Sequence, residues 1–244
     1  MDKSFVFTIL GNGRKGYLER TIASWETNMV QKPKYQAIFD DSGNQEYRNW
    51  LQDTYGDRYD IVCPSDVPVG QSKAIQAIFD YIKPLDVDYV VSTEEDWVLF
   101  RTVNFLPIFE VLNNNINLLQ MRLPRTIWYA DYHIFDLDAG SLLLDYIKDK
   151  QSPFEYVDDC WFNIKTDSYA WSHNPCVFKK EYVYEEYSRI GDHEFNFGLD
   201  LMRKNPNATV GFWANNPFDG YVTHIGIRNP FTLARLHPYE KLSY

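Results

Sequence analysis

The first 96 residues alternate between short apolar runs and segments with helical spacing, and this alternation constrains the fold more than any other feature. The apolar runs cover residues 4–10, 35–39, 59–63 and 88–92. Between them, apolar residues recur every three or four positions, as on the amphipathic segment 71–82. The order β-α-β-α-β-α-β predicts a mostly parallel sheet with right-handed crossovers, flanked by helices in a single α/β domain.

The fourth apolar run stops abruptly in Glu94, Glu95 and Asp96, followed by Trp97. In open α/β sheets, ligands bind at the carboxyl ends of the strands. Three anions about 4 Å apart repel one another by several kcal/mol unless solvent or a cation screens them. Mn²⁺ or Mg²⁺ would accept one or two of these carboxylates and complete its shell with phosphate oxygens and water, which indicates a nucleotide diphosphate. The alternative is that the acids interact with the positive end of the next helix.

Two further motifs follow the first and second strands. Asp40 and Asp41 end the second strand and can accept hydrogen bonds from a base imino group and a ribose hydroxyl. They are also typical of a turn ahead of a helix starting near Gln45. The glycines at positions 11, 13 and 16 formally match a dinucleotide fingerprint, but a lone match without the downstream acidic residue is weak.

The second half of the chain is less regular. Residues 103–112 are predicted as a helix and 117–123 as a strand on which Gln120 and Arg122 share one face. Arg122 could neutralise a phosphate or the acidic triplet, or form a structural salt bridge. Residues 128–150 have no clear period and are predicted to be a variable insertion. Residues 195–203 are predicted as a helix whose start carries two carboxylates, which could serve only as caps.

Composition excludes several classes of function. The net charge of −10 argues against a general affinity for nucleic acid or anionic membranes. No apolar run is long enough to span a membrane, and residues 5–10 are too short for a signal peptide, so a cytoplasmic location is expected. The three widely spaced cysteines indicate neither a disulfide framework nor a zinc site. Aromatic residues make up 17% of the chain, which favours a sugar or base ligand only mildly because aromatics also fill cores.

The acidic triplet with Trp97 at the end of a hydrophobic strand resembles the Asp-x-Asp-type motif of nucleotide-sugar glycosyltransferases with the GT-A fold, a Rossmann-like architecture. The resemblance covers residues 1–226, with a nucleotide-binding half at about 1–100 and an acceptor-side half at about 101–226. Residues 227–244 would form a tail or flap. Glu94 and Glu95 replace the commoner aspartates of this motif, so it stays open which of the three acids contacts the ribose and which contacts the metal. We assign the metal to Asp96.

The resemblance also implies the other site residues. His224, followed by Ile225 and Gly226, is similar to a late histidine that coordinates the metal or a phosphate, and it is favoured over His173 and His193. In inverting members a carboxylate near the late helix is the general base, which implies Glu194 ahead of Asp192. Together with Arg122, the candidate donor-binding residues are Thr8, Asn12, Asp40, Gly70, Lys73, Glu94 and Glu95.

The expected reaction is transfer of a sugar from a nucleotide diphosphate, with UDP as the expected nucleotide, to an acceptor hydroxyl. Inversion of the anomeric configuration is expected. Retention is the alternative if neither Glu194 nor Asp192 lies near the acceptor. The acceptor stays open among a glycan, a small molecule, a protein and a hydroxymethylated base in phage DNA. Two other functions compete: a catalytically silent GT-A-like module that binds a nucleotide or glycan, and a nucleotidyltransferase. The latter needs a basic, glycine-rich phosphate loop, which residues 11–15 supply only in part.

Overall fold

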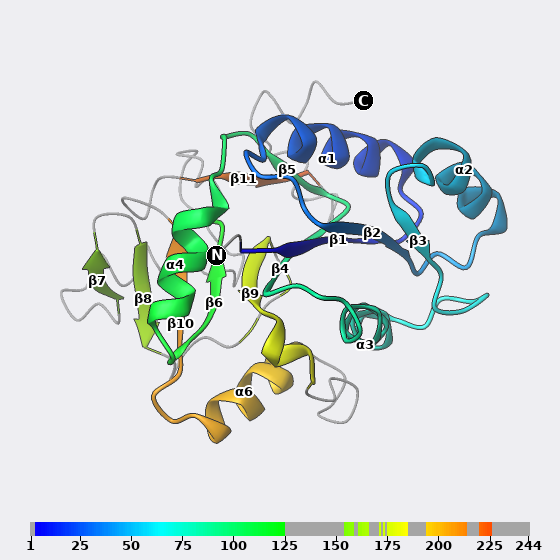
Figure 1. Ribbon diagram of the computed structural model, residues 1–244. Helices are drawn as coiled ribbons and strands as arrows, with labels where there is room; N and C mark the ends of the chain where they lie inside the picture. The colour runs from blue at the N-terminus through cyan, green and yellow to red at the C-terminus, as the bar shows by residue number, and fades with distance from the viewer. Residues whose placement is uncertain are drawn as a thin grey trace, which may run out of the picture.

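The computed structural model describes residues 3–124, 154–158, 161–165, 171, 173, 175–184, 194–213 and 220–225. These residues form a nine-stranded sheet in the order β3-β2-β1-β4-β9-β6-β10-β8-β7 and a two-stranded sheet of β11 and β5 (Figure 1). The strands are β1 Phe5–Gly11, β2 Tyr35–Asp40, β3 Asp60–Val62, β4 Tyr89–Glu94, β5 Trp97–Leu99, β6 Leu118–Arg122, β7 Phe154–Asp158, β8 Trp161–Lys165, β9 Cys176–Lys179, β10 Thr209–Trp213 and β11 Val222–His224. The helices are α1 Lys15–Asn28, α2 Gln45–Tyr55, α3 Gln71–Ile82, α4 Phe105–Asn114 and α6 Glu194–Lys204, with a 3-10 helix, η1, at Lys180–Tyr184.

The amino-terminal half has the predicted β/α alternation. Strand β1 lies between β2 and β4 and is parallel to both, and β3 extends the sheet beyond β2. Helix α3 has both of its predicted ends, because its apolar residues face one side and Gly70 precedes its first turn with a φ of 83° that favours glycine. Helix α2 begins after Asn44, whose side chain accepts a hydrogen bond from the backbone N–H of Tyr47.

The second half of the sheet is mixed. Strand β9 lies antiparallel between β4 and β6, β10 is parallel to β6, and β8 is antiparallel to both β10 and β7. In the described part of the chain, seven of the nine strands of this sheet therefore run in one direction, and β8 and β9 run in the other. The predicted mostly parallel α/β sheet is confirmed.

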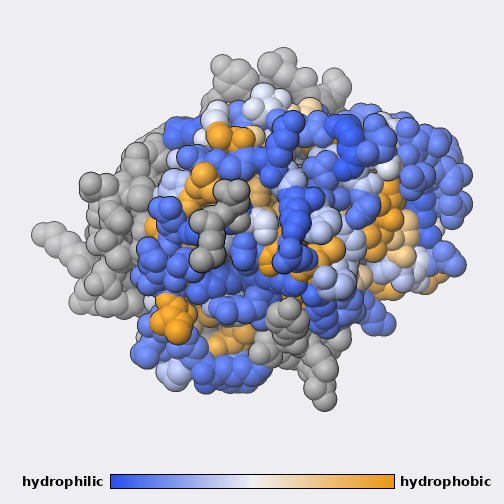
Figure 2. All heavy atoms as spheres, viewed as in Figure 1, coloured by the Kyte–Doolittle hydropathy of each residue, from blue (hydrophilic) through white to orange (hydrophobic). Residues whose placement is uncertain are grey.

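Helices cover both faces of the sheet (Figure 1). Helices α1, α2 and α4 contribute to one hydrophobic core, in which Trp25 stacks on Phe7 with ring centroids 5.0 Å apart. Helices α3 and α6 contribute to the other core, where Phe79 and Phe197 meet edge to face at 5.5 Å. Each fully buried aromatic of this size contributes about 1.5–3 kcal/mol through removal of apolar surface from water. Figure 2 shows that the exterior of one face is mainly hydrophilic, with apolar residues in small separate areas.

The register brings the ends of three parallel strands together. Gly11 at the end of β1 pairs with Asp40 at the end of β2, and Leu10 pairs with Glu94 at the end of β4. After a two-residue turn, Trp97 starts β5 and pairs with His224 of β11. This edge therefore gathers residues from the start, middle and end of the chain. No helix within the described ranges is both long and apolar enough to cross a membrane.

Candidate functional site

The acidic turn between β4 and β5 is buried and held from three sides. The side chains of Glu95 and Asp96 are 1% and 4% exposed. The backbone N–H of Glu95 donates to the carbonyl of Leu10 at 2.9 Å, and its carbonyl accepts from the Thr21 hydroxyl of α1 at 2.6 Å. The carbonyl of Asp96 accepts from the backbone N–H of Ile225 at 2.8 Å. The two carboxylates therefore sit on a fixed backbone.

Arg14 is the cation that faces these carboxylates. It occupies the N-cap position of α1, and its Nε lies 2.6 Å from Glu95 Oε1. Its Nη2 lies 2.8 Å from Asp96 Oδ2, and its backbone N–H donates to Glu95 Oε2 at 3.3 Å. The sequence indicated a positive partner for the acids and offered a metal or Arg122. Arg122 is buried in β6, with its guanidinium 5.5 Å from the centroid of the Phe212 ring, and its role at a phosphate or at the acids stays a prediction.

The two carboxylates differ in electrostatic environment. Burial raises the pKa of Glu95, against the opposing effect of Arg14 and of the backbone N–H groups of Asn12 and Arg14. Burial also disfavours ionisation of Asp96, but the hydrogen bond and charge of His224, together with Arg14, outweigh it and lower the pKa of Asp96. Asp96 is therefore the better-stabilised anion of the pair.

His224 lies beside Asp96 across the β5–β11 pairing. Its Nε2 is 3.1 Å from Asp96 Oδ2, and its ring packs on Trp97 with centroids 4.7 Å apart. His173 has a different environment, because it is buried beside Phe79 of the other core and its Nε2 accepts a hydrogen bond from the indole of Trp171 at 3.1 Å. Burial lowers the pKa of His173 to about 3, so this ring is neutral near pH 7. Of these two histidines, the structure brings only His224 to the acids.

Asp96 and His224 could supply two of the ligands that a divalent cation needs. Asp96 Oδ1 is buried, and within the described residues it has no hydrogen-bond partner. Carboxylate oxygen and imidazole nitrogen are both suitable ligands for Mn²⁺. No group of three or more His, Cys, Asp or Glu side chains in the described ranges is placed to hold a metal. A cation at this position would therefore take most of its ligands from elsewhere.

Asp40 and Asp41 hold loops in place. The Asp40 side chain is fully buried; its Oδ1 accepts from the backbone N–H of Ser42 at 2.9 Å, and its Oδ2 lies 3.0 Å from Arg48 Nε. Asp41 accepts from the backbone N–H groups of Val69 and Gly70 at 2.7 and 3.0 Å. The expected contact of Asp40 with a base stays a prediction, and it requires this buried carboxylate to become accessible.

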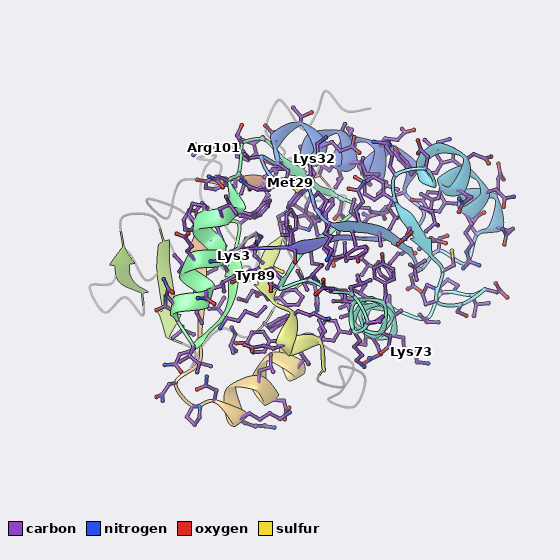
Figure 3. The ribbon with its side chains drawn as sticks, viewed as in Figure 1. Lys3, Met29, Lys32, Lys73, Tyr89 and Arg101 are labelled. Carbon is purple, nitrogen blue, oxygen red and sulfur yellow. The ribbon has the colours of Figure 1, made fainter. Side chains whose placement is uncertain are left out.

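The remaining donor-binding candidates lie at different distances from the acids. Thr8 is buried in the middle of β1, and its hydroxyl donates to Ser92 at 3.1 Å. Asn12 is exposed, and its backbone N–H bonds to Glu95. Gly70 precedes Gln71, whose side-chain amide donates to Glu94 at 3.2 Å, so the start of α3 lies beside the acids. Lys73 is exposed and leaves α3 on the side turned away from the sheet (Figure 3).

The candidate base is described only through its backbone. Glu194 is the first residue of α6, and its side chain lies outside the described part of the structure, as do Asp192 and His193. The predicted insertion at 128–150 and the tail at 227–244 also lie outside the described residues.

The sequence reasoning missed the roles of three residues of this site: Arg14, considered only as part of a partial phosphate loop, and Thr21, which hold the acidic turn, and Arg48, which pairs with Asp40. A signal for Arg14 existed, since it directly follows the predicted turn after β1, at the same sheet edge as the acids.

Comparison with known proteins gives a likeness in structure. No protein-family model and no curated protein matches the sequence. A solved structure of a mycobacterial protein matches with a TM-score of 0.55 and 11% identity, over 95% of this chain and 70% of that one. Residues 1–349 of S. aureus TarS match with a TM-score of 0.54 and 13% identity, over 91% and 60% of the two chains.

A third match is glucosyl-3-phosphoglycerate synthase from Mycobacterium tuberculosis in complex with Mn²⁺, UDP and phosphoglyceric acid. Its TM-score is 0.54 and its identity 12%, over 96% of this chain and 74% of that one. At such identities the likeness establishes the fold. The mostly parallel sheet flanked by helices is the GT-A fold.

Proposed function

We propose that this protein is a metal-dependent glycosyltransferase that moves a sugar from a nucleotide diphosphate, with UDP as the expected nucleotide, to an acceptor hydroxyl. One observation carries the proposal: Asp96, in the turn that follows β4 in a GT-A fold, is buried and ionised, with one carboxylate oxygen that has no hydrogen-bond partner among the described residues and His224 beside the other. The Mn²⁺ and UDP bound to glucosyl-3-phosphoglycerate synthase, which shares this fold, support it.

Asp96 and His224 are the residues that would hold Mn²⁺ or Mg²⁺. Such an ion, when bound, acts as a Lewis acid that offsets charge on the leaving diphosphate. Hard divalent ions are commonly held by one or two protein ligands together with substrate phosphates. The pair of protein ligands is consistent with that mode, because the diphosphate and water would supply the rest of the shell.

The surrounding residues would position the donor. Glu94 lies at the end of β4, beside Gln71 and the start of α3. Either Glu94 or Glu95 would accept a hydrogen bond from a ribose hydroxyl of the donor. Asn12 lies in the loop that bonds to Glu95. Asp40 is proposed to face the base, either directly or through the turn that it fixes at Ser42.

For the chemical step, Glu194 or Asp192 would take the proton of the acceptor hydroxyl as its oxygen attacks the anomeric carbon, which gives inversion. The start of α6 at Glu194 is consistent with this role, since the positive end of a helix favours a carboxylate in its ionised, basic form. If neither residue lies near the acceptor, retention with a leaving phosphate oxygen as the base is the alternative. The acceptor class stays open among glycan, small molecule, protein and hydroxymethylated DNA base.

A donor screen tests this function. The protein is incubated with Mn²⁺ and a panel of nucleotide sugars, and release of nucleoside diphosphate and free sugar is measured. We expect release from one donor class, and its loss in Asp96→Asn. Asp86→Asn is the matched control, because Asp86 is an exposed carboxylate whose salt bridge, among the described residues, is with Lys34 and not with a residue of the site.

The products separate the competing functions. Release of pyrophosphate would favour a nucleotidyltransferase. Binding of nucleotide and metal without any sugar release, across donors and acceptors, would favour a silent binding module.

A further inference from the structure

We propose that Arg14 and the divalent metal exchange at Asp96, so that the protein binds the metal strongly only together with a diphosphate. This inference rests on the proposed function, since it concerns the same site. It makes Arg14 a positioning residue that keeps the acids neutralised before the donor arrives and contacts the diphosphate afterwards.

The first step of the argument is the contact itself. Arg14 bridges two carboxylates with two different nitrogens, Nε to Glu95 and Nη2 to Asp96. A guanidinium presents its donors in a planar fork, so one edge can stay bonded while another changes partner. Glu95 is the deeper anchor, because it also accepts the backbone N–H of Arg14.

The second step is the charge balance. Glu95 and Asp96 carry two negative charges, and Arg14 supplies one positive charge between them. A divalent ion on Asp96 would lie within a few ångströms of the guanidinium, and because Asp96 is buried and Arg14 only partly exposed, water screens the repulsion of these like charges incompletely. The ion and the Arg14–Asp96 contact therefore compete. A diphosphate removes this conflict, because its negative charge balances both cations.

The third step is that Arg14 has room to move. Its side chain is 41% exposed, whereas both acids are buried. Apart from the two acids, its contact within the described ranges is the ring of Tyr17, 5.2 Å from the guanidinium carbon. When Nη2 leaves Asp96 it can donate to a phosphate oxygen while Nε stays on Glu95, and arginine is well suited to such charge-assisted pairs.

Arg20 provides a matched control on the same helix. It contacts the same Tyr17 ring at 5.2 Å, and its Nε donates to the carbonyl of Gly16. None of the ion pairs between described residues joins Arg20 to a carboxylate of the site. Arg20→Gln therefore removes the same charge from α1 without touching Glu95 or Asp96.

The test is titration calorimetry of the full chain with Mn²⁺ alone, and with Mn²⁺ in the presence of saturating UDP. For the native protein we expect UDP to strengthen Mn²⁺ binding by at least about 10-fold, as an energetic coupling between two ligands of one site. For Arg14→Gln we expect Mn²⁺ alone to bind about 10-fold more tightly than to the native protein, with a smaller effect of UDP. Arg20→Gln should behave as the native protein does.

Three results would overturn the exchange. If Arg14→Gln leaves the affinity for Mn²⁺ alone unchanged or lowers it, while the native protein binds Mn²⁺ with UDP, the exchange is wrong and the proposed function stands. If UDP binds the native protein equally well with and without Mn²⁺, the exchange is wrong, because Arg14 alone would serve the diphosphate. If no protein binds Mn²⁺ and UDP under any condition, the proposed function fails and the exchange fails with it. A urea unfolding curve for each variant confirms that it is folded.

Discussion

Replacing Arg48 by methionine should destabilise the protein strongly, because it isolates a buried carboxylate. Asp40 is fully buried, and Arg48, 8% exposed, is its charged partner at 3.0 Å. Arg48 also contacts Asp66 and the carbonyl of Ser65, which ties the loop before α3 to the turn after β2. Methionine keeps an unbranched apolar stem in place of the arginine side chain while removing every one of these polar contacts.

The expected loss of stability comes from the Asp40 carboxylate, which stays buried without its charged partner. Breaking a buried ion pair costs about 3–5 kcal/mol, because the remaining charge has no partner. We expect about 3 kcal/mol for Arg48→Met, the low end of that range, since Arg48 also reaches an exposed partner. The Asp66 carboxylate is fully exposed, so Asp66→Asn should cost no more than about 1 kcal/mol.

The assay is urea unfolding of the four members of a double-mutant cycle. The double variant Asp40→Asn, Arg48→Met also neutralises Asp40 and so removes the isolated charge. Its free energy of unfolding should be about 2 kcal/mol higher than the sum of the two single effects predicts. The reasoning is refuted if Arg48→Met alone costs less than about 1 kcal/mol, or if the two substitutions add without coupling.

The other predictions concern binding, pH and catalysis. Asp96→Ala should abolish Mn²⁺-dependent UDP binding in calorimetry, measured on protein that a urea unfolding curve shows to be folded; metal-dependent binding that survives would remove Asp96 from the site. Because burial lowers the pKa of His173 to about 3, the unfolded chain takes up a proton below its own pKa of about 6.5 that the folded protein does not. Stability should therefore fall by about 2 kcal/mol between pH 7 and pH 5, and this part of the decline should vanish in His173→Gln; an identical pH dependence in both proteins would contradict it. Glu194→Gln should leave donor affinity unchanged and slow transfer by roughly 100-fold or more, with Asp192→Asn as its comparison, and full transfer in both variants would rule out the inverting assignment.

The sequence was a good guide where local pattern decides the structure. The amphipathic spacing and the preceding Gly70 predicted α3 at both ends, and the strand ending in the acidic triplet was placed correctly as β4. These features depend on side-chain periodicity and turn chemistry within about ten residues.

Pairings between distant segments were beyond local reasoning. Strand β9 lies between β4 and β6 although it follows both in sequence, because strand partners are chosen by packing rather than by local preference. The contact between Asp96 and His224 spans 128 residues and depends on the pairing of β5 with β11. Only the family resemblance placed those two residues in one site.

The charge partners show the same limit. A positive group at the acids was expected on electrostatic grounds, but residue order alone did not single out Arg14. The burial of Asp40 depends on Arg48, which comes from the next helix, so a carboxylate that looked available in the sequence is already paired in the structure.

The most direct test of the donor site is a crystal structure of the protein with Mn²⁺ and UDP, in which anomalous scattering locates the manganese. We expect the anomalous peak at coordination distance, about 2.0–2.3 Å, from Asp96 Oδ1, with diphosphate oxygens completing the shell and His224 beside it. A manganese peak bound to other residues, with UDP away from the ends of β1 and β4, would contradict the account.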